Sequence, residues 1–179
     1  MGQHEGESAR IFLSAPWFSE IDPALGRAVL SALTETRAAS GTILLAEGHA
    51  NDHLSFLMSG SAAVQRGKMG GGWETLATLA APTLFGVTSF FRPQPPTFTV
   101  RAATDVSLLT LDHPAHDRLR RENPAAAEAL AIALLRVLGD RFEELDRVFS
   151  DYMARHPDDH AKVTEWAGFR ARLFDERGD

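Results

Sequence analysis

The chain has 179 residues, of which 44% are hydrophobic and 23% are charged, a composition typical of one folded domain rather than of a disordered segment. It has no cysteine, which excludes disulfides, thiolate metal sites and a cysteine nucleophile. The net charge of -6 argues against a DNA-binding surface, and no apolar run is long enough to span a membrane. We therefore expect a cytoplasmic protein that binds neither DNA nor membrane.

The first 36 residues predict a helical segment. Residues 1–9 are polar and are expected to form a frayed terminus. Ser14 and Pro16 are typical of a short capped helix, and Asp22 followed by Pro23 predicts the start of a longer one.

Residues 37–112 predict a β-roll. Short segments that are rich in apolar and β-branched residues alternate with glycines, and they lie at 42–48, 53–60, 61–67, 74–80, 98–102 and 106–112. Strands this short and this evenly spaced indicate an antiparallel roll or barrel rather than βαβ units. The fold class expected is therefore mainly β, with flanking helices.

The helical pattern returns in residues 113–155. A short helix is predicted from His113 to Glu122, and Asn123 and Pro124 predict the start of a helix that runs to about Arg155, with Pro157 ending it. We expect the part around Leu130 and Leu134 to pack on the roll.

The second part of this long helix carries an apolar seam. Its members recur at alternating steps of three and four residues, the spacing of a two-helix interface, and they are Leu135, Leu138, Phe142, Leu145, Phe149 and Tyr152. We expect this seam to form the interface of a homodimer, because an exposed apolar seam would otherwise promote aggregation.

Residues 156–179 form a tail of 24 residues. They are too few for the three helices and the wing strands of a winged helix-turn-helix, so no DNA-binding domain is expected. One side of a short amphipathic helix is predicted from Val163, Trp166, Phe169 and Leu173. Such a helix would dock on the dimer or on a protein partner.

The order of these motifs resembles the cyclic nucleotide-binding domain of the catabolite activator (Crp/Fnr-like) family. The matching pieces, in chain order, are Gly41-Thr42-Ile43 with Gly48, residues 56–60, Leu84-Phe85-Gly86, Thr99-Val100-Arg101-Ala102, and residues 108–111. The resemblance implies a double-stranded β-helix, jelly-roll-like, with a C-terminal dimerisation helix. It also implies a non-enzymatic regulatory module for signal transduction.

In that family, the segment after Phe-Gly is the phosphate-binding cassette. A glutamate follows the glycine and holds the ribose, and an arginine three residues before the Thr-Val-Arg-Ala threonine holds the cyclic phosphate. These positions carry Val87 and Pro96 here. Hydrogen bonds to charged groups contribute about 1.5–3 kcal/mol each. Losing both anchors would cost roughly 3–6 kcal/mol, or about a hundred- to ten-thousand-fold in affinity, so we do not expect tight cyclic nucleotide binding.

The candidate ligand residues of this degenerate cassette are Phe85, Gly86, Val87, Thr88, Ser89, Arg92, Pro96, Thr97 and Thr99. One interpretation is a collapsed, filled pocket. The other is a sensor site for a non-standard ligand, held by the hydroxyls or by Arg92 reaching back into the pocket. No cofactor is expected under either interpretation.

A roll could also belong to a cupin, which would make the protein a metal enzyme. His49 and His53 are the nearest candidate ligands, but they are separated by three residues across a turn, whereas cupins place two histidines one residue apart on a strand. We therefore expect no metal. His113 and His116 are expected to be solvated surface residues.

Overall fold

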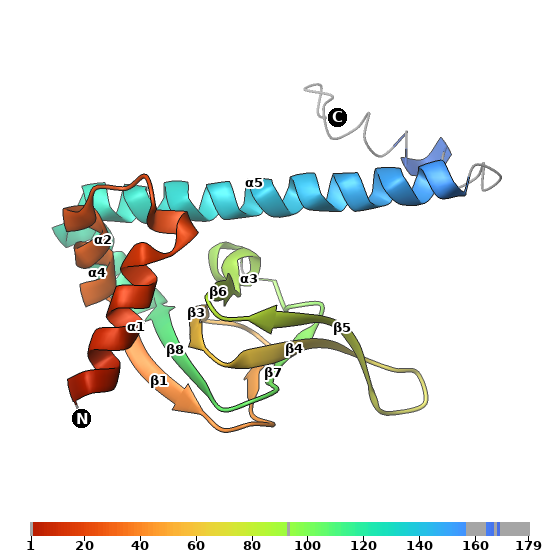
Figure 1. Cartoon of the computed structure of the whole chain (residues 1–179), viewed down its shortest axis with the longest axis horizontal. Helices are drawn as coiled ribbons and strands as arrows, with labels where there is room; N and C mark the ends of the chain where they lie inside the picture. Colours follow the sequence, from red (N-terminus) through yellow and green to blue (C-terminus); the bar gives the residue numbers. More distant parts are fainter. Residues whose placement is uncertain (1, 93, 157–163, 167, 169–179) are drawn as a thin grey trace. The chain divides into compact units, whose positions relative to one another are not determined.

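The structure is a computed structural model that describes residues 2–92, 94–156, 164–166 and 168, with side chains from residue 6 onward. The chain divides into two units, residues 1–135 and 136–179, which are considered separately. Of the elements in the described residues, the first unit contains all the strands and most of the helices (Figure 1). In chain order, the elements are α1 (Gly2–Ser14), η1 (Pro16–Phe18), α2 (Pro23–Ser31), β1 (Thr34–Ala38), β2 (Ile43–Leu45), β3 (His53–Ser59), β4 (Ser61–Gly67), β5 (Trp73–Ala80), β6 (Thr83–Phe85), α3 (Val87–Phe91), β7 (Thr99–Ala102), β8 (Val106–Asp112), α4 (His113–Glu122) and α5 (Pro124–Arg155).

The eight strands form two antiparallel four-stranded sheets. One sheet has the order β1-β8-β3-β6, and the other has the order β2-β7-β4-β5. Both sheets contribute to one apolar core, whose buried members include Leu57 on β3, Phe85 on β6 and Val100 on β7. The two sheets therefore pack face to face, and the predicted β-roll with flanking helices is confirmed.

The sequence prediction missed β1. This strand pairs with β8, from Thr34 opposite Thr110 to Ala38 opposite Val106. Its sequence, Thr-Glu-Thr-Arg-Ala, is polar and mostly exposed, so it lacks the apolar alternation that identifies a half-buried strand. The roll consequently begins at Thr34, inside the segment that we assigned to the N-terminal helices.

The N-terminal helices pack on β3. Phe12 of α1 is fully buried, and its ring lies 4.8 Å from that of Phe18 and 5.0 Å from that of Phe56. Ser8 is also buried and donates a hydrogen bond to Glu35 Oε1 over 2.8 Å. The expectation of a frayed terminus through residue 9 is therefore wrong at Ser8, because the helix begins earlier and its second turn is tied to β1.

Two of the three predicted capping residues are confirmed, but Ser14 is not one of them: it is the last residue of α1, its hydroxyl donates to the Ile11 oxygen, and η1 begins after Ala15 with no side-chain cap. Asp22 accepts a hydrogen bond from the Ala24 amide over 2.6 Å at the start of α2. Asn123 Oδ1 accepts one from the Ala126 amide over 3.1 Å at the start of α5. Within the first unit, Leu130 and Leu134 of α5 are buried, as expected.

The second unit contains the rest of α5, up to Arg155, and the described part of the tail. The Phe149 ring lies 4.1 Å from that of Trp166, so this tail residue contacts the end of α5. The positions expected to end α5 and to line the tail helix, Pro157, Val163, Phe169 and Leu173, lie outside the described residues. Among the helices that the structure describes, none is long and apolar enough to cross a membrane.

Candidate functional site

The cassette begins with a glycine that no other residue could replace without strain. Gly86 follows β6 and has a φ of 84°, in the left-handed region that favours glycine. A Cβ atom placed there would lie 2.8 Å from the backbone oxygen of His53 and 3.1 Å from Asn51 Nδ2. The chain therefore turns sharply from β6 into α3 and packs directly against the start of β3.

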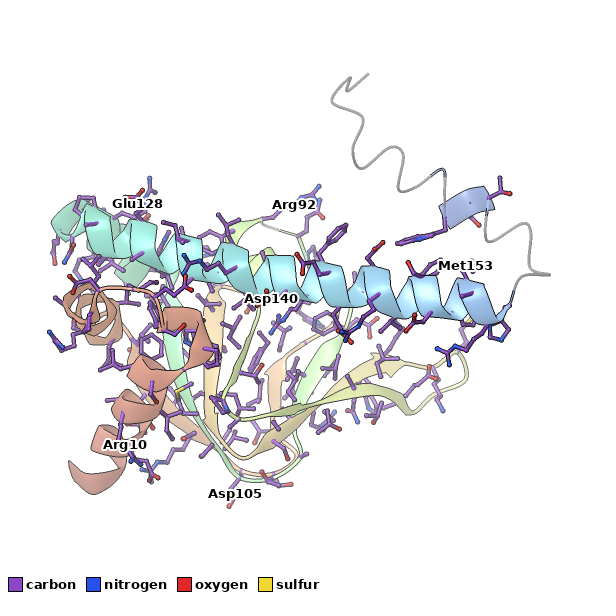
Figure 2. The ribbon with its side chains drawn as sticks, turned by 45° about the horizontal axis from the view of Figure 1, so that its top comes forward. Arg10, Arg92, Asp105, Glu128, Asp140 and Met153 are labelled. Carbon is purple, nitrogen blue, oxygen red and sulfur yellow. The ribbon has the colours of Figure 1, made fainter. Side chains whose placement is uncertain are left out.

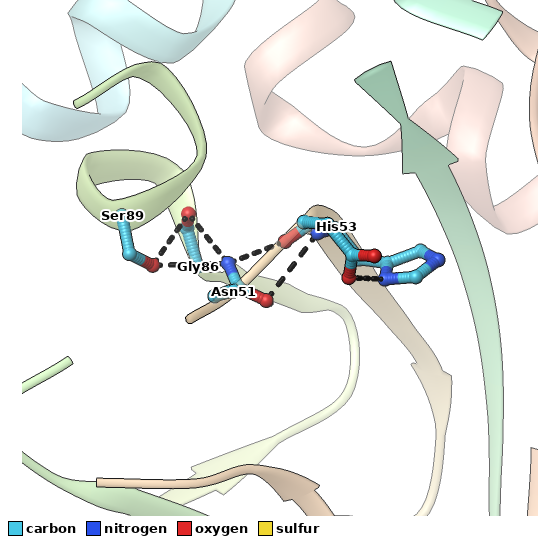
Figure 3. Close-up of polar contacts among 5 residues, drawn as sticks. Asn51, His53, Gly86 and Ser89 are labelled. Carbon is cyan, nitrogen blue, oxygen red and sulfur yellow. Dashed lines mark hydrogen bonds and ion pairs between the residues drawn. The ribbon is translucent and has the colours of Figure 1, made fainter. Parts of the chain in front are cut away.

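Asn51 holds this turn in place, and the sequence analysis did not identify it. Its Nδ2 donates to the backbone oxygen of His53 over 2.8 Å and to Ser89 Oγ over 2.9 Å, as Figure 3 shows. Its Oδ1 accepts from the His53 amide, and Ser89 Oγ donates to the Gly86 oxygen over 3.2 Å. An asparagine before a strand is typical of a turn, but nothing in the sequence indicates its partner 38 residues later.

Next to this turn lies a cavity of about 170 Å³. Six of the nine candidate ligand residues line it, namely Gly86, Thr88, Ser89, Arg92, Pro96 and Thr97. Four further residues complete its wall: Leu45, Gln94, Pro95 and Phe98. The structure therefore brings together most of the residues that the sequence singled out.

Phe85, Val87 and Thr99 do not line this cavity. Phe85 belongs to the apolar core between the sheets, and Val87 is buried at the start of α3. Thr99 is also buried, and its Oγ1 accepts a hydrogen bond from the Glu47 amide over 3.1 Å. These three side chains support the cassette from inside.

The two positions that carry charged anchors in the family are apolar and buried here. Val87 is only 4% exposed. Pro96 is buried as well, and its carbonyl oxygen accepts a hydrogen bond from the Gly48 amide over 2.9 Å. The backbone at Pro96 is therefore fixed, and no carboxylate or guanidinium extends from either position.

Arg92 is the one charged side chain among the described residues that line the cavity. It is exposed, and within the described part of the chain its guanidinium forms neither a hydrogen bond nor an ion pair. In Figure 2, Arg92 and Asp105 lie at opposite ends of the roll. The cavity thus has a positive charge at its rim and no lining carboxylate to compensate it.

Arg101, the other arginine near the cassette in sequence, has a structural role. Its Nε donates to Gln65 Oε1 over 3.2 Å, and its Nη1 donates to the Gly41 oxygen over 2.8 Å. Its guanidinium also lies over the Trp73 ring, 5.4 Å from the centroid. These contacts hold β7 against its neighbours and occupy the guanidinium of Arg101 in structural interactions.

Two histidines of α4 pack against the cassette helix. The His113 ring stacks on Phe90 of α3 at 4.3 Å, and the His116 ring lies 5.5 Å from that of Phe91. Burial lowers the pKa of His116 below its usual value, and the positive charge of Arg120 lowers it further. His113 is exposed, as expected, whereas His116 is half-buried, and both rings contact α3.

The histidines considered for a metal make other contacts. His49 Nδ1 lies 2.9 Å from the Glu47 oxygen, and His53 Nδ1 lies 2.5 Å from Asp52 Oδ1. Within the described part of the chain, no group of three or more histidine, aspartate or glutamate side chains is placed to hold a metal ion. The geometry thus offers no support for the cupin alternative.

A larger cavity, of about 480 Å³, lies between α1 and the β1–β8 side of the roll. Its lining mixes Glu7, Glu35 and Asp105 with Arg37, so its charges partly cancel. Glu35 is already bonded to Ser8 across it. We therefore place the candidate site in the cassette cavity, which is lined by Arg92 and by the hydroxyls of Thr88 and Thr97 and by no carboxylate among the described residues.

Comparison with known proteins finds relatives of the roll and its flanking helices. A model of the cyclic nucleotide-binding domain family matches residues 35–123. The CRP-like cAMP-activated global transcriptional regulator of Mycobacterium tuberculosis is 29% identical over 147 residues, which cover 81% of this chain and 65% of that protein. The chain thus spans just under two thirds of this relative's length.

Solved structures show the same fold. The catabolite activator protein of Thermus thermophilus is 28% identical, with a TM-score of 0.60 over 75% of this chain and 63% of that one. The N-terminal domain of a Streptomyces coelicolor transcriptional regulator is also 28% identical, with a TM-score of 0.63 over 75% and 94% of the two chains. A cyclic nucleotide-binding domain from Methylobacillus flagellatus, 23% identical, shares the fold with a TM-score of 0.70 over 83% and 84%. The chain therefore belongs to the cyclic nucleotide-binding domain family, and residues 35–123 form that domain.

Proposed function

We propose that this chain is a dimeric, non-catalytic regulatory module whose cassette no longer binds cyclic nucleotides tightly. The observation that supports this most is the pair of buried apolar side chains, Val87 and Pro96, at the two anchor positions. A cyclic phosphodiester is an anion, and the guanidinium that would pair with it at the second position is replaced by the apolar ring of Pro96. The affinity should fall by about a hundred- to ten-thousand-fold.

The size of the cavity also supports this proposal. Pockets that enclose drug-sized ligands usually measure about 300–1,000 Å³. The cassette cavity measures about 170 Å³. A cyclic nucleotide would fit only if the cassette opened, and the Asn51 hydrogen bonds to Ser89 and His53 oppose that opening.

The contact between α3 and α4 offers a route for a signal. Phe90 and Phe91 belong to α3, which borders the cavity, and they pack on His113 and His116 of α4. A displacement of α3 would therefore change its contact with α4 directly. We propose that α4 passes this change to the long helix that follows it.

The exposed face of α5 supports the proposed homodimer. Leu135 is 66% exposed, Phe142 43% and Leu145 57% in the single chain. Large apolar side chains spaced as a seam become stable when a second copy covers them. In the dimer, two cassettes would be coupled to one pair of α5 helices.

Titration calorimetry with cyclic AMP and cyclic GMP tests the proposal. We expect no saturation in the micromolar range for the native chain. The double variant Val87→Glu with Pro96→Arg, which restores both family anchors, should bind more tightly than the native chain, provided that circular dichroism shows it to be folded. Micromolar binding of either nucleotide to the native chain would refute the proposal.

A further inference from the structure

We propose that the cassette cavity binds a small oxyanion, of the size of orthophosphate or a short carboxylate, with Arg92 as its main contact. This inference rests on the proposed function, because it assigns a ligand class to a cassette that no longer binds cyclic nucleotides tightly. It is carried by three features of the cavity: its charge, its free hydrogen-bond donors and its volume.

The charge of the cavity favours an anion. Arg92 lines it, and no aspartate or glutamate is among the described residues that do so. The guanidinium has no ion-pair partner in the described part of the chain. An arginine in this state is free to form a bidentate, charge-assisted pair with an oxyanion, a geometry that neither chloride nor a neutral ligand can match.

The donors that surround Arg92 are also unengaged. In the part of the chain that the structure describes, the side chains of Thr88, Gln94 and Thr97 form no hydrogen bond, and all three are exposed at the cavity. Ser89 differs, because its hydroxyl is already bonded to Asn51 and Gly86. Two hydroxyls and one amide thus remain to satisfy the oxygens that Arg92 leaves unbonded.

The volume limits the ligand's size. The cavity measures about 170 Å³, which is below the roughly 300–1,000 Å³ of pockets that enclose drug-sized ligands. Orthophosphate and short carboxylates are much smaller than a drug-sized ligand, whereas a cyclic nucleotide is itself of drug size. Leu45, Pro95 and Phe98 add apolar surface to the wall of the cavity.

Thermal unfolding of the full chain tests the inference. Orthophosphate and acetate are titrated against native protein, with sodium chloride at matched ionic strength as the reference. We expect orthophosphate, and acetate more weakly, to raise the Tm in a saturable way that chloride does not reproduce. Arg92→Ala should weaken the apparent affinity by at least about tenfold, and Arg92→Lys, which keeps the charge and loses the fork, should weaken it less.

A matched control separates a site from a general effect of charge. Arg10 is an exposed arginine on α1 that lies well away from Arg92 in Figure 2. Arg10→Ala should keep the native response to orthophosphate. Because both arginines are exposed, neither variant should lower the Tm appreciably in the absence of anion, and the Thr97→Val variant gives an independent test of the same site.

The outcomes distinguish this inference from the proposed function. A native response no larger than that to chloride, or one that Arg92→Ala retains, overturns the anion site and leaves the degenerate cassette standing. Micromolar binding of a cyclic nucleotide in a parallel titration overturns the degenerate cassette instead. A saturable response to orthophosphate that depends on both Arg92 and Thr97, without cyclic nucleotide binding, supports both.

Discussion

The side-chain amide of Asn51 donates a hydrogen bond to Ser89 Oγ over 2.9 Å, and this bond joins the entry of β3 to the helix of the cassette. The same amide also bonds to the His53 oxygen. The shape of the cassette therefore depends on a residue that lies 38 positions earlier in the chain.

Removing this amide should destabilise the protein. Asn51→Ala leaves the His53 oxygen and the partly buried Ser89 hydroxyl without this donor, so we expect the free energy of unfolding to fall by about 1–3 kcal/mol. For a chain of this size, this corresponds to about 2–4 °C in Tm for each kcal/mol. Ser31→Ala is the control, because its exposed hydroxyl bonds only to the Ala28 oxygen. Equal Tm values for the two variants would contradict the role given to Asn51.

Gly86→Ala should be more harmful than a glycine change with the same backbone angle elsewhere. Gly86 and Gly72 have φ values of 84° and 86°, but only a Cβ at Gly86 would collide with a backbone oxygen, that of His53. Gly72→Ala should cost about 1–2 kcal/mol from the left-handed conformation alone. Gly86→Ala should cost more than that, measured by urea unfolding. If the two losses are the same, the close approach to His53 is unimportant.

Acid should weaken the contact between α3 and α4. Burial lowers the pKa of His116 in the folded protein, so the unfolded chain binds its proton more readily. The stability that His116 contributes is therefore complete above its unfolded pKa, about 6.5, and is lost as the pH falls from there through the lower folded value. The charged and titratable groups that act on it are His113, Asp117 and Arg120.

Urea unfolding at pH 7.5, 6.0 and 5.0 measures this effect. His116→Asn should show a smaller loss of stability toward pH 5.0 than the native chain. His49→Asn removes a histidine outside this contact and should keep the native dependence. If His116→Asn loses as much stability between pH 7.5 and pH 5.0 as the native chain does, other groups cause the acid sensitivity.

A charge in the apolar seam of α5 should prevent dimerisation. Leu145 is 57% exposed in the single chain, and an aspartate there would be buried in the proposed interface without a partner. We expect light scattering to give the mass of a dimer for the native chain and of a monomer for Leu145→Asp. Asp140→Ala, which alters an exposed residue of α5 off the seam, should remain dimeric. A native chain that is monomeric at all concentrations would rule out the interface.

The sequence predicted best where local chemistry decides the structure. Asn123 and Pro124 define the start of α5 through a side-chain cap and a fixed φ, and the structure agrees. β1 was missed because its polar residues acquire strand structure only by pairing with β8, a contact more than 60 residues away. Helix α1 was missed because its first two turns are polar and its stability comes from the burial of Phe12.

The candidate site, too, could be predicted only where it depends on local sequence and not on distant contacts. The order of motifs predicts where the cassette lies and which residues occupy its anchor positions, because both follow from the register of the chain. The sequence could not show that Arg92 lacks a partner while Arg101 is bonded to Gln65 and Gly41. It also could not show that Asn51 holds the turn, since both facts depend on how distant strands meet.

A single residue, Asn123, separates α4 from α5. It lies in an extended region, with φ -144° and ψ 75°, and the proline after it disfavours helical values at this position. The proline therefore disfavours a continuous helix through this joint. A tilt of α4 that begins at the cassette would therefore be transmitted to α5, because no flexible linker separates the two helices.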